Sequence, residues 1–203
     1  MHLLHIDSSA RTAGSLTRQL SAEYVAAWQA KHPQGTVTHR DVARDTPNLV
    51  STDWITGVFG PAEAHTAESK EAVEASEVLI REVEAADVLV LGVPTYNFGV
   101  PASFKAWIDQ VCMAGRTFAY DENGPRGLLS GKKVVVVRSS GSDFGTPASA
   151  PMDFYGPYLR GVLGFLGITD VEFIAVHGNT PEQIEAAVRK GSVAIAASLS
   201  AAA

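Results

Sequence analysis

The stretch DVLVLGVPTYNFGVPASFKAWIDQV, residues 87–111, indicates both the fold and a place where a ligand would bind. Its first part, residues 87–93, is a continuous apolar run typical of a strand covered on both faces. Further on, Phe104, Ile108 and Val111 recur at the spacing of a helix. The turn between them carries two prolines, two aromatic residues, an asparagine and a glycine, more than a plain connection needs. The sequence therefore predicts a buried strand and a helix joined by a functional loop.

The rest of the chain repeats this alternation of strand and helix. The five predicted strands are Leu3–Asp7, Thr36–Asp41, Asp87–Val93, Lys133–Arg138 and Val171–Val176. Amphipathic segments fall between them, and Pro181 stands where a last helix would begin. This pattern predicts a doubly wound α/β fold with helices on both faces of a parallel sheet, in a single domain over residues 1–203.

Two connections are too long and too apolar to be simple links. Residues 45–64 contain Trp54, Ile55, Val58 and Phe59. For Trp54 and Phe59, packing on the core and contact with a second subunit remain equally open. Residues 115–132 contain Phe118, Tyr120 and the turn-rich sequence ENGPRG, which is compatible with a hairpin flap.

Composition excludes several classes of function. The net charge of −6, without a dense block of Lys and Arg, argues against a nucleic-acid partner. The apolar runs are strand-sized and the first residues lack the pattern of a signal peptide, so we expect a cytoplasmic protein with no membrane segment. Cys112, the one cysteine, is expected to be an ordinary half-buried thiol. His2 and His5 are three apart on a strand and the other histidines are scattered, so we predict no metal site.

The loop after the first strand, DSSARTAGSLT at 7–17, has the features of an anion site. It combines hydroxyls and a flexible glycine with the start of a helix: Ser8, Ser9, Gly14, Ser15 and Thr17. Free backbone N–H groups and the helix dipole favour a phosphate there. By itself, Ser15 is better explained as a helix N-cap, and it is the cluster of hydroxyls that makes phosphate binding an equal alternative. The motifs of P-loop NTPases and of dinucleotide-binding Rossmann turns are absent, which favours a cofactor that keeps its phosphate.

Two further loops have the features of a site for a planar ring. In residues 94–101, Tyr96 and Phe98 offer aromatic faces and Asn97 offers a donor and an acceptor. The loop RSSGSDFG at 138–145 is short, polar and suited to the edge of a ring. Taken alone, the first of these loops would equally cap the core, and the second would be a generic turn.

The position of the three loops carries more weight than any one of them. They follow strands one, three and four, whose carboxyl ends cluster when the strand order is the flavodoxin-like 2-1-3-4-5. Ligands of open α/β sheets bind at this edge. A phosphate at the first loop and a flat ring between the other two together describe FMN.

The sequence also resembles a known family, the FMN-dependent NADH-azoreductases, also called FMN-dependent NADH:quinone oxidoreductases. The resemblance extends over almost the whole chain. It is carried by SS at 8–9, GSLT at 14–17, PTYNF at 94–98, TFAYDENGPRGLLSGKK at 117–133, SSGS at 139–142 and YLRGVLGFLGITDVEF at 158–173. It implies a flavodoxin-like homodimer with one FMN per subunit near the dimer interface.

The resemblance also implies which residues bind the cofactor. The implied phosphate contacts are Ser9, Ser15, Leu16 through its backbone, and Thr17. The implied ring contacts are Thr95, Tyr96, Asn97 and Phe98, with Ser139, Ser140, Gly141 and Ser142 along the far edge. The family commonly has Met in place of Thr95 and a second Gly in place of Ser142. Neither difference removes a backbone donor, so we expect FMN binding to be kept and the flavin potential and substrate preference to differ.

The expected reaction is a two-step, ping-pong transfer of a hydride from NADH to flavin N5 and then of two electrons to a quinone or azo compound. The cofactor carries out the chemistry, so we assign no catalytic residue and predict Phe98 and Tyr120 as walls of the substrate site. The alternative is a flavodoxin-like carrier of single electrons. A serine hydrolase is disfavoured by the lack of G-x-S-x-G, and a phosphoacceptor receiver by Gly92-Val93-Pro94 at the end of strand three.

Overall fold

In a computed structural model, which describes residues 1–201, the predicted strands and helices are all present. The elements are, in chain order, β1 (His2–Asp7), α1 (Leu16–Lys31), β2 (Thr36–Asp41), α2 (Thr52–Phe59), η1 (Ala62–Ala64), α3 (Ala67–Ala85), β3 (Val88–Pro94), α4 (Ala102–Val111), β4 (Phe118–Asp121), β5 (Gly124–Gly127), β6 (Lys133–Ser140), η2 (Ala150–Met152), α5 (Tyr155–Phe165), β7 (Asp170–His177) and α6 (Pro181–Ala201).

The main sheet has the strand order β2-β1-β3-β6-β7, and every pairing in it is parallel. This is the predicted order 2-1-3-4-5, with the fourth and fifth strands being β6 and β7. The register places Leu4 beside Leu89, and Leu89 beside Val134. All carboxyl ends of the strands therefore lie at one edge of the sheet.

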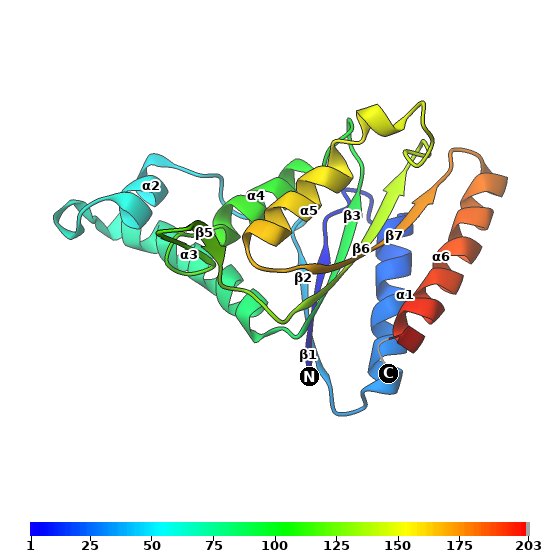
Figure 1. The fold of residues 1–203 in the computed structure, drawn as a ribbon, viewed down its shortest axis with the longest axis horizontal. Coiled ribbons are helices and arrows are strands. Elements are labelled where there is room, and N and C mark those ends of the chain that lie inside the picture. Colours follow the sequence, from blue (N-terminus) through cyan, green and yellow to red (C-terminus); the bar gives the residue numbers. More distant parts are fainter. Residues whose placement is uncertain (202–203) are drawn as a thin grey trace.

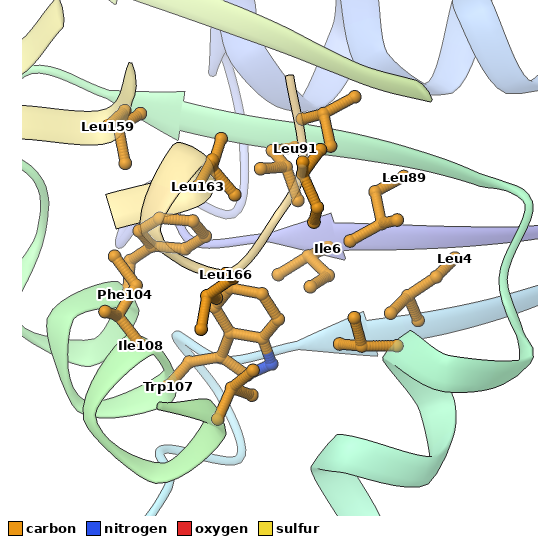
Figure 2. Close-up of a cluster of buried hydrophobic side chains, with 14 of the residues drawn as sticks. Leu4, Ile6, Leu89, Leu91, Phe104, Trp107, Ile108, Leu159, Leu163 and Leu166 are labelled. Carbon is orange, nitrogen blue, oxygen red and sulfur yellow. The ribbon is translucent and has the colours of Figure 1, made fainter. Parts of the chain in front are cut away.

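Helices cover both faces of the sheet, as predicted. Figure 1 shows α1 and α6 on one face and α3, α4 and α5 on the other. Successive residues of β3 alternate between the two faces: Leu89 and Leu91 belong to the core under α3–α5, and Val88 and Val90 to the core under α1 and α6. Figure 2 shows the first of these cores. Burying each such side chain contributes about 1.5–3 kcal/mol, which is why the strand is apolar throughout.

The two long connections each form an element of their own. Residues 118–127 form the predicted hairpin, in which β4 and β5 pair antiparallel. Trp54 on α2 is buried against Ile80 and Met113, and its indole N–H donates to Ser76 Oγ at 2.7 Å. Trp54 is thus a core residue, so the subunit contact considered for it is wrong. Phe59 is 65% exposed and leaves that possibility open.

None of the helices in the described residues combines the length and the apolar character that crossing a membrane requires.

Tyr155, at the start of α5, allows a test of how the ends of the strands are held. Its side chain is fully buried and its hydroxyl donates to the Val93 carbonyl oxygen at 2.7 Å. We expect Tyr155→Phe to lower the free energy of unfolding by about 1–2 kcal/mol, because it leaves a buried carbonyl without its donor. Urea unfolding measures this. Tyr158→Phe is the matched control, since the Tyr158 hydroxyl makes no hydrogen bond within the described chain; an equal loss in both variants would contradict the prediction.

Candidate functional site

Four loops meet at the carboxyl edge of the sheet and enclose a groove of about 230 Å³. Three of them are the loops that the sequence predicts, after β1, β3 and β6. Of the predicted residues, the groove is lined by Ser9, Ser15, Leu16, Thr95, Tyr96, Ser139, Ser140 and Gly141. The remaining lining comes from Arg11, Gly14, Pro94, the fourth loop, after β7, and Ile184 on α6.

The loop after β1 ends in a helix start whose first donors are free. Ser15 is the N-cap of α1, and its Oγ accepts the Arg18 backbone N–H at 3.4 Å. The next two backbone N–H groups, of Leu16 and Thr17, donate to nothing among the described residues. Such donors lie at the positive end of the helix dipole and suit a phosphate. The interpretation of Ser15 as an N-cap is thus confirmed. The same helix start still has free N–H groups with which it could bind an anion.

Arg18 fixes the loop after β1 by hydrogen bonds and an ion pair. Its guanidinium donates to the Ser9 carbonyl oxygen at 2.8 Å and the Arg11 carbonyl oxygen at 3.1 Å. It also makes a bidentate pair with Asp41 at 2.7 and 2.9 Å. Burial opposes ionisation of Asp41, but the Arg18 hydrogen bonds outweigh it and lower the pKa of that carboxyl. The loop is therefore fixed by a partly buried ion pair that does not itself line the groove.

Asp7 lies beneath the same loop, with two histidines beside it. The prediction that the histidines are scattered is therefore wrong for His5 and His39. The parallel register places His5 beside His39, and their rings are 4.7 Å apart. His39 Nε2 lies 3.0 Å from Asp7 Oδ2, and His5 Nε2 lies 3.6 Å from Asp7 Oδ1. Burial would raise the pKa of Asp7, but the hydrogen bonds and charges of these groups lower it. The sequence does not reveal the pair of His5 and His39, because the two residues are brought together by strand pairing and not by closeness in the chain. The absence of a metal site stays a prediction.

The loop after β3 forms a tight turn with an uncommon backbone. Tyr96 and Gly99 exchange two backbone hydrogen bonds, of 2.9 and 3.0 Å, around Asn97 and Phe98. These two residues have φ values of 47° and 70°, which a bulky residue such as phenylalanine rarely adopts. Such strain is concentrated at ligand sites, because the surrounding structure must enforce it. The Tyr96 hydroxyl accepts the Ala10 backbone N–H at 3.2 Å and so joins this turn to the first loop.

The loop after β6 forms the opposite wall. The Thr95 N–H donates to the Ser139 carbonyl oxygen at 2.8 Å, which ties the second and third loops together. Ser140 Oγ donates to the Ser142 carbonyl oxygen at 2.6 Å and shapes the turn. The fourth loop, which the sequence analysis missed, contributes Asn179, whose Nδ2 donates to the Gly141 carbonyl oxygen at 2.7 Å. The signal was available: HGNT, at 177–180, is a polar turn after the last strand and before a helix.

Five of the predicted site residues do not line the groove. Thr17 is fully buried, with its Oγ1 against Ser15 Oγ. Asn97, Phe98 and Ser142 are exposed on the loops that carry the lining residues. Tyr120 lies on the hairpin, 70% exposed, and its ring contacts Phe118. Within one chain Tyr120 is therefore not brought to the groove.

Cys112 is the half-buried thiol that the sequence predicts. It directly follows α4, and burial, reinforced by Asp109, raises its pKa to about 11. The thiol is therefore protonated at neutral pH and is a poor nucleophile.

The donor set of the groove fits FMN. Two free backbone N–H groups and the hydroxyl of Ser15 stand at one end, where a phosphate would be held. The Tyr96 ring and the loops after β3 and β6 supply further lining, against which a planar ring would lie. Together with the strand order, this arrangement defines a flavodoxin-like α/β protein.

Comparisons with known proteins agree. A family model described as "Flavodoxin-like fold" matches residues 1–199. The chain is 46% identical over 175 residues to an FMN-dependent NADH:quinone oxidoreductase of Nostoc punctiforme, covering 86% of this chain and 85% of that protein. It is also 46% identical over 195 residues to FMN-dependent NADH:quinone oxidoreductase 1 of Jannaschia sp., covering 91% and 97%. The crystal structure of an azoreductase from Bacillus anthracis superposes with a TM-score of 0.86 at 25% identity, over 96% of this chain and 98% of that one. The chain belongs to the family of FMN-dependent NADH:quinone oxidoreductases.

The Arg18–Asp41 pair predicts how the stability of the site depends on pH. The pKa of Asp41 in the folded protein lies below its ordinary value of 3.8. The pair is therefore fully stabilising above that pH, and its contribution is lost as the pH falls through the folded value. We expect Asp41→Asn to lower the free energy of unfolding by about 2 kcal/mol at pH 7, and the difference from wild type to shrink below about pH 4.

Urea unfolding at a series of pH values measures both quantities. Asp45→Asn is the control, because Asp45 is exposed and forms no ion pair within the described residues. The prediction is wrong if the two variants lose the same stability, or if the Asp41→Asn deficit persists unchanged at pH 3.

Proposed function

We propose that this chain is an FMN-dependent oxidoreductase that takes a hydride from NADH and reduces quinones and aromatic azo compounds. One observation carries the proposal: a phosphate-type loop and two ring-type loops line a single groove. The relatives named for this activity share nearly half of their residues with the chain over most of its length. The names of these relatives do not favour the alternative of a single-electron carrier.

The residues of the groove have binding and orienting roles. Ser9, Ser15, Leu16 and Thr17 would hold the phosphate, and the loops at 95–98 and 139–142 would hold the ring. When bound, FMN supplies the two-electron chemistry, and the protein holds it in place and excludes water from part of it. No catalytic acid or base is assigned to the groove, because the donor and the acceptor would react at the cofactor in turn, at the same place.

The donor and acceptor classes determine the partners that we propose. NADH, quinones and azo compounds are small molecules, and neither a nucleic acid nor a membrane is needed. A cytoplasmic location follows from a soluble nicotinamide donor. We also propose that residues 1–203 form a single FMN-binding domain, which the continuous match over residues 1–199 supports.

We further propose that the chain is a homodimer. Residues 49–59, at one end of the molecule in Figure 1, expose Leu49, Ile55 and Phe59 by 74%, 49% and 65%. Apolar side chains gathered in this way are typical of an interface. A second copy also offers a role for Tyr120: if it forms a wall of the substrate site, as predicted, it must come from the partner.

The reductase proposal is tested by the absorbance spectrum of purified protein after FMN is added and the excess removed. We expect flavin bands that are bleached by NADH under anaerobic conditions and restored by a quinone. Bands that NADH cannot bleach would support a carrier, and loss of all flavin, also on direct titration, would contradict the site. Ser15→Ala should weaken FMN binding about tenfold, because it removes a donor to the phosphate.

The dimer is tested by sedimentation at micromolar concentration. We expect wild type to be a dimer and Phe59→Asp to be a monomer, since a buried, unpaired carboxylate destabilises an apolar interface. Val193→Asp is the matched control, because Val193 is 70% exposed on α6, which lies across the sheet from α2 in Figure 1. A monomeric wild type, or a dimeric Phe59→Asp, would rule this interface out.

A further inference from the structure

Arg138, near the end of β6, is the most deeply buried cation of the described chain. It is 6% exposed, and no other arginine or lysine among residues 1–201 is buried to that degree. From the sequence it is the last residue of a predicted strand and the first of the polar loop at 138–145, with no role of its own. Burying a guanidinium carries a large desolvation cost unless several partners offset it, so its surroundings call for an explanation.

Its partners come from three segments that surround the ring end of the groove. The Nε–H donates to Thr95 Oγ1 at 3.0 Å, and Nη1 donates to Asp153 Oδ2 at 2.9 Å. The guanidinium also lies between two aromatic rings, 4.9 Å from the centre of Phe144 and 4.4 Å from that of Tyr155. Arg138 therefore joins the second loop, the third loop and the start of α5.

One nitrogen of the guanidinium is left over. Nη2 is buried and has no hydrogen-bond partner among the described residues. Asp153 is shared between Arg138 and the start of α5, where its Oδ1 accepts the N–H groups of Tyr155 and Gly156. The guanidinium is thus paired with a single carboxylate, which it shares with the backbone of α5. A stable core alone would be served equally well by an apolar residue at this position.

Arg138 stands directly behind the loop that faces the ring. It is paired with Val93 in the sheet, and its Thr95 partner lines the groove and is a predicted ring contact. Phe144, which covers one side of the guanidinium, makes an edge contact with Phe98, at 6.3 Å between ring centres. The charge is therefore one residue removed from the groove and is 6% exposed, and on its other side Arg138 borders a second cavity of about 550 Å³ together with Phe144 and Asp153.

A buried charge at this place acts on a redox cofactor. Transfer of a hydride to a bound ring brings two electrons and one proton, so the ring gains one negative charge. A cation in a poorly solvated environment stabilises that charge much more than it would in water. We infer that Arg138 is a positioning residue that fixes Thr95 against the flavin ring and whose buried charge raises the reduction potential of bound FMN. This rests on the proposed function, because it requires FMN in the groove.

The decisive experiment compares two variants that change the local charge in opposite directions. Arg138→Gln removes the cation, and Asp153→Asn removes its counter-charge while keeping an oxygen for the start of α5. We expect Arg138→Gln to lower the equilibrium constant for reduction of bound FMN about tenfold, and Asp153→Asn to raise it about tenfold. A tenfold change corresponds to about 30 mV in the reduction potential of a two-electron couple. Equilibration against reference dyes measures the potential without turnover.

Two further variants separate charge from position. Arg138→Lys keeps the charge but loses the planar fork, so FMN should bind about tenfold more weakly with a smaller change of potential than in Arg138→Gln. Arg40→Gln is the control: Arg40, on β2, pairs with Glu82, its Nε donating to Glu82 Oε2 at 2.6 Å, and it lines neither the groove nor the cavity beside Arg138. The reduction potential of FMN bound to this control variant should equal that of FMN bound to wild type.

The outcomes are distinct. Potentials that move in the same direction in Arg138→Gln and Asp153→Asn, or that do not move, overturn the inference, because a purely structural role predicts no opposite shifts. If Arg138→Gln fails to fold, Asp153→Asn decides alone, since an unchanged or lowered potential contradicts the inference. A wild-type protein that retains no FMN overturns the proposed function and the inference with it, whereas wild type that is loaded and reducible leaves the function intact whatever the variants do.

Discussion

Parallel pairing of the five strands is the constraint on which the rest of the structure depends. Strands that all run in one direction must be connected across the faces of the sheet, so both faces are covered by helices and the inner strands β3 and β6 become apolar. The same pairing brings the four loops after β1, β3, β6 and β7 to one edge. At that edge backbone N–H and carbonyl groups leave the ladder, and the polar groups of a ligand site become available without opening the core.

The sequence predicted what depends on local pattern. Apolar runs located the strands, and the hydroxyl-rich, aromatic and polar turns located three of the four loops. Ser15 was recognisable as an N-cap because its role needs only the residues next to it. The helix α2 shows the limit of local reasoning: its periodicity separates Trp54 and Val58 from Ile55 and Phe59. Only the packing against α3 shows that the first pair points inward.

The sequence could not predict what depends on which strands pair. The neighbours His5 and His39 are 34 residues apart in the chain and adjacent in the sheet. In the sequence Arg138 is only the end of a valine run, and its partners on β3, the 143–145 turn and α5 are not visible there. The polar turn at 177–180 is visible in the sequence, but that Asn179 in it donates to Gly141 is not. In each case the partner is set by tertiary structure, which no spacing rule encodes.

The two halves of the site share one principle of construction. Behind the phosphate loop stands Arg18 with Asp41, and behind the ring loops stands Arg138 with Asp153. Each arginine donates to loop atoms, a carbonyl oxygen or a hydroxyl, while a carboxylate holds the other side of its planar fork. Apart from the exposed Arg11, the wall that meets the ligand consists of backbone and uncharged side chains, and these two ion pairs lie one layer behind it. Such a wall can accommodate a ligand whose charge changes during the reaction, because its uncharged groups are already oriented and none of them has to titrate when that change occurs.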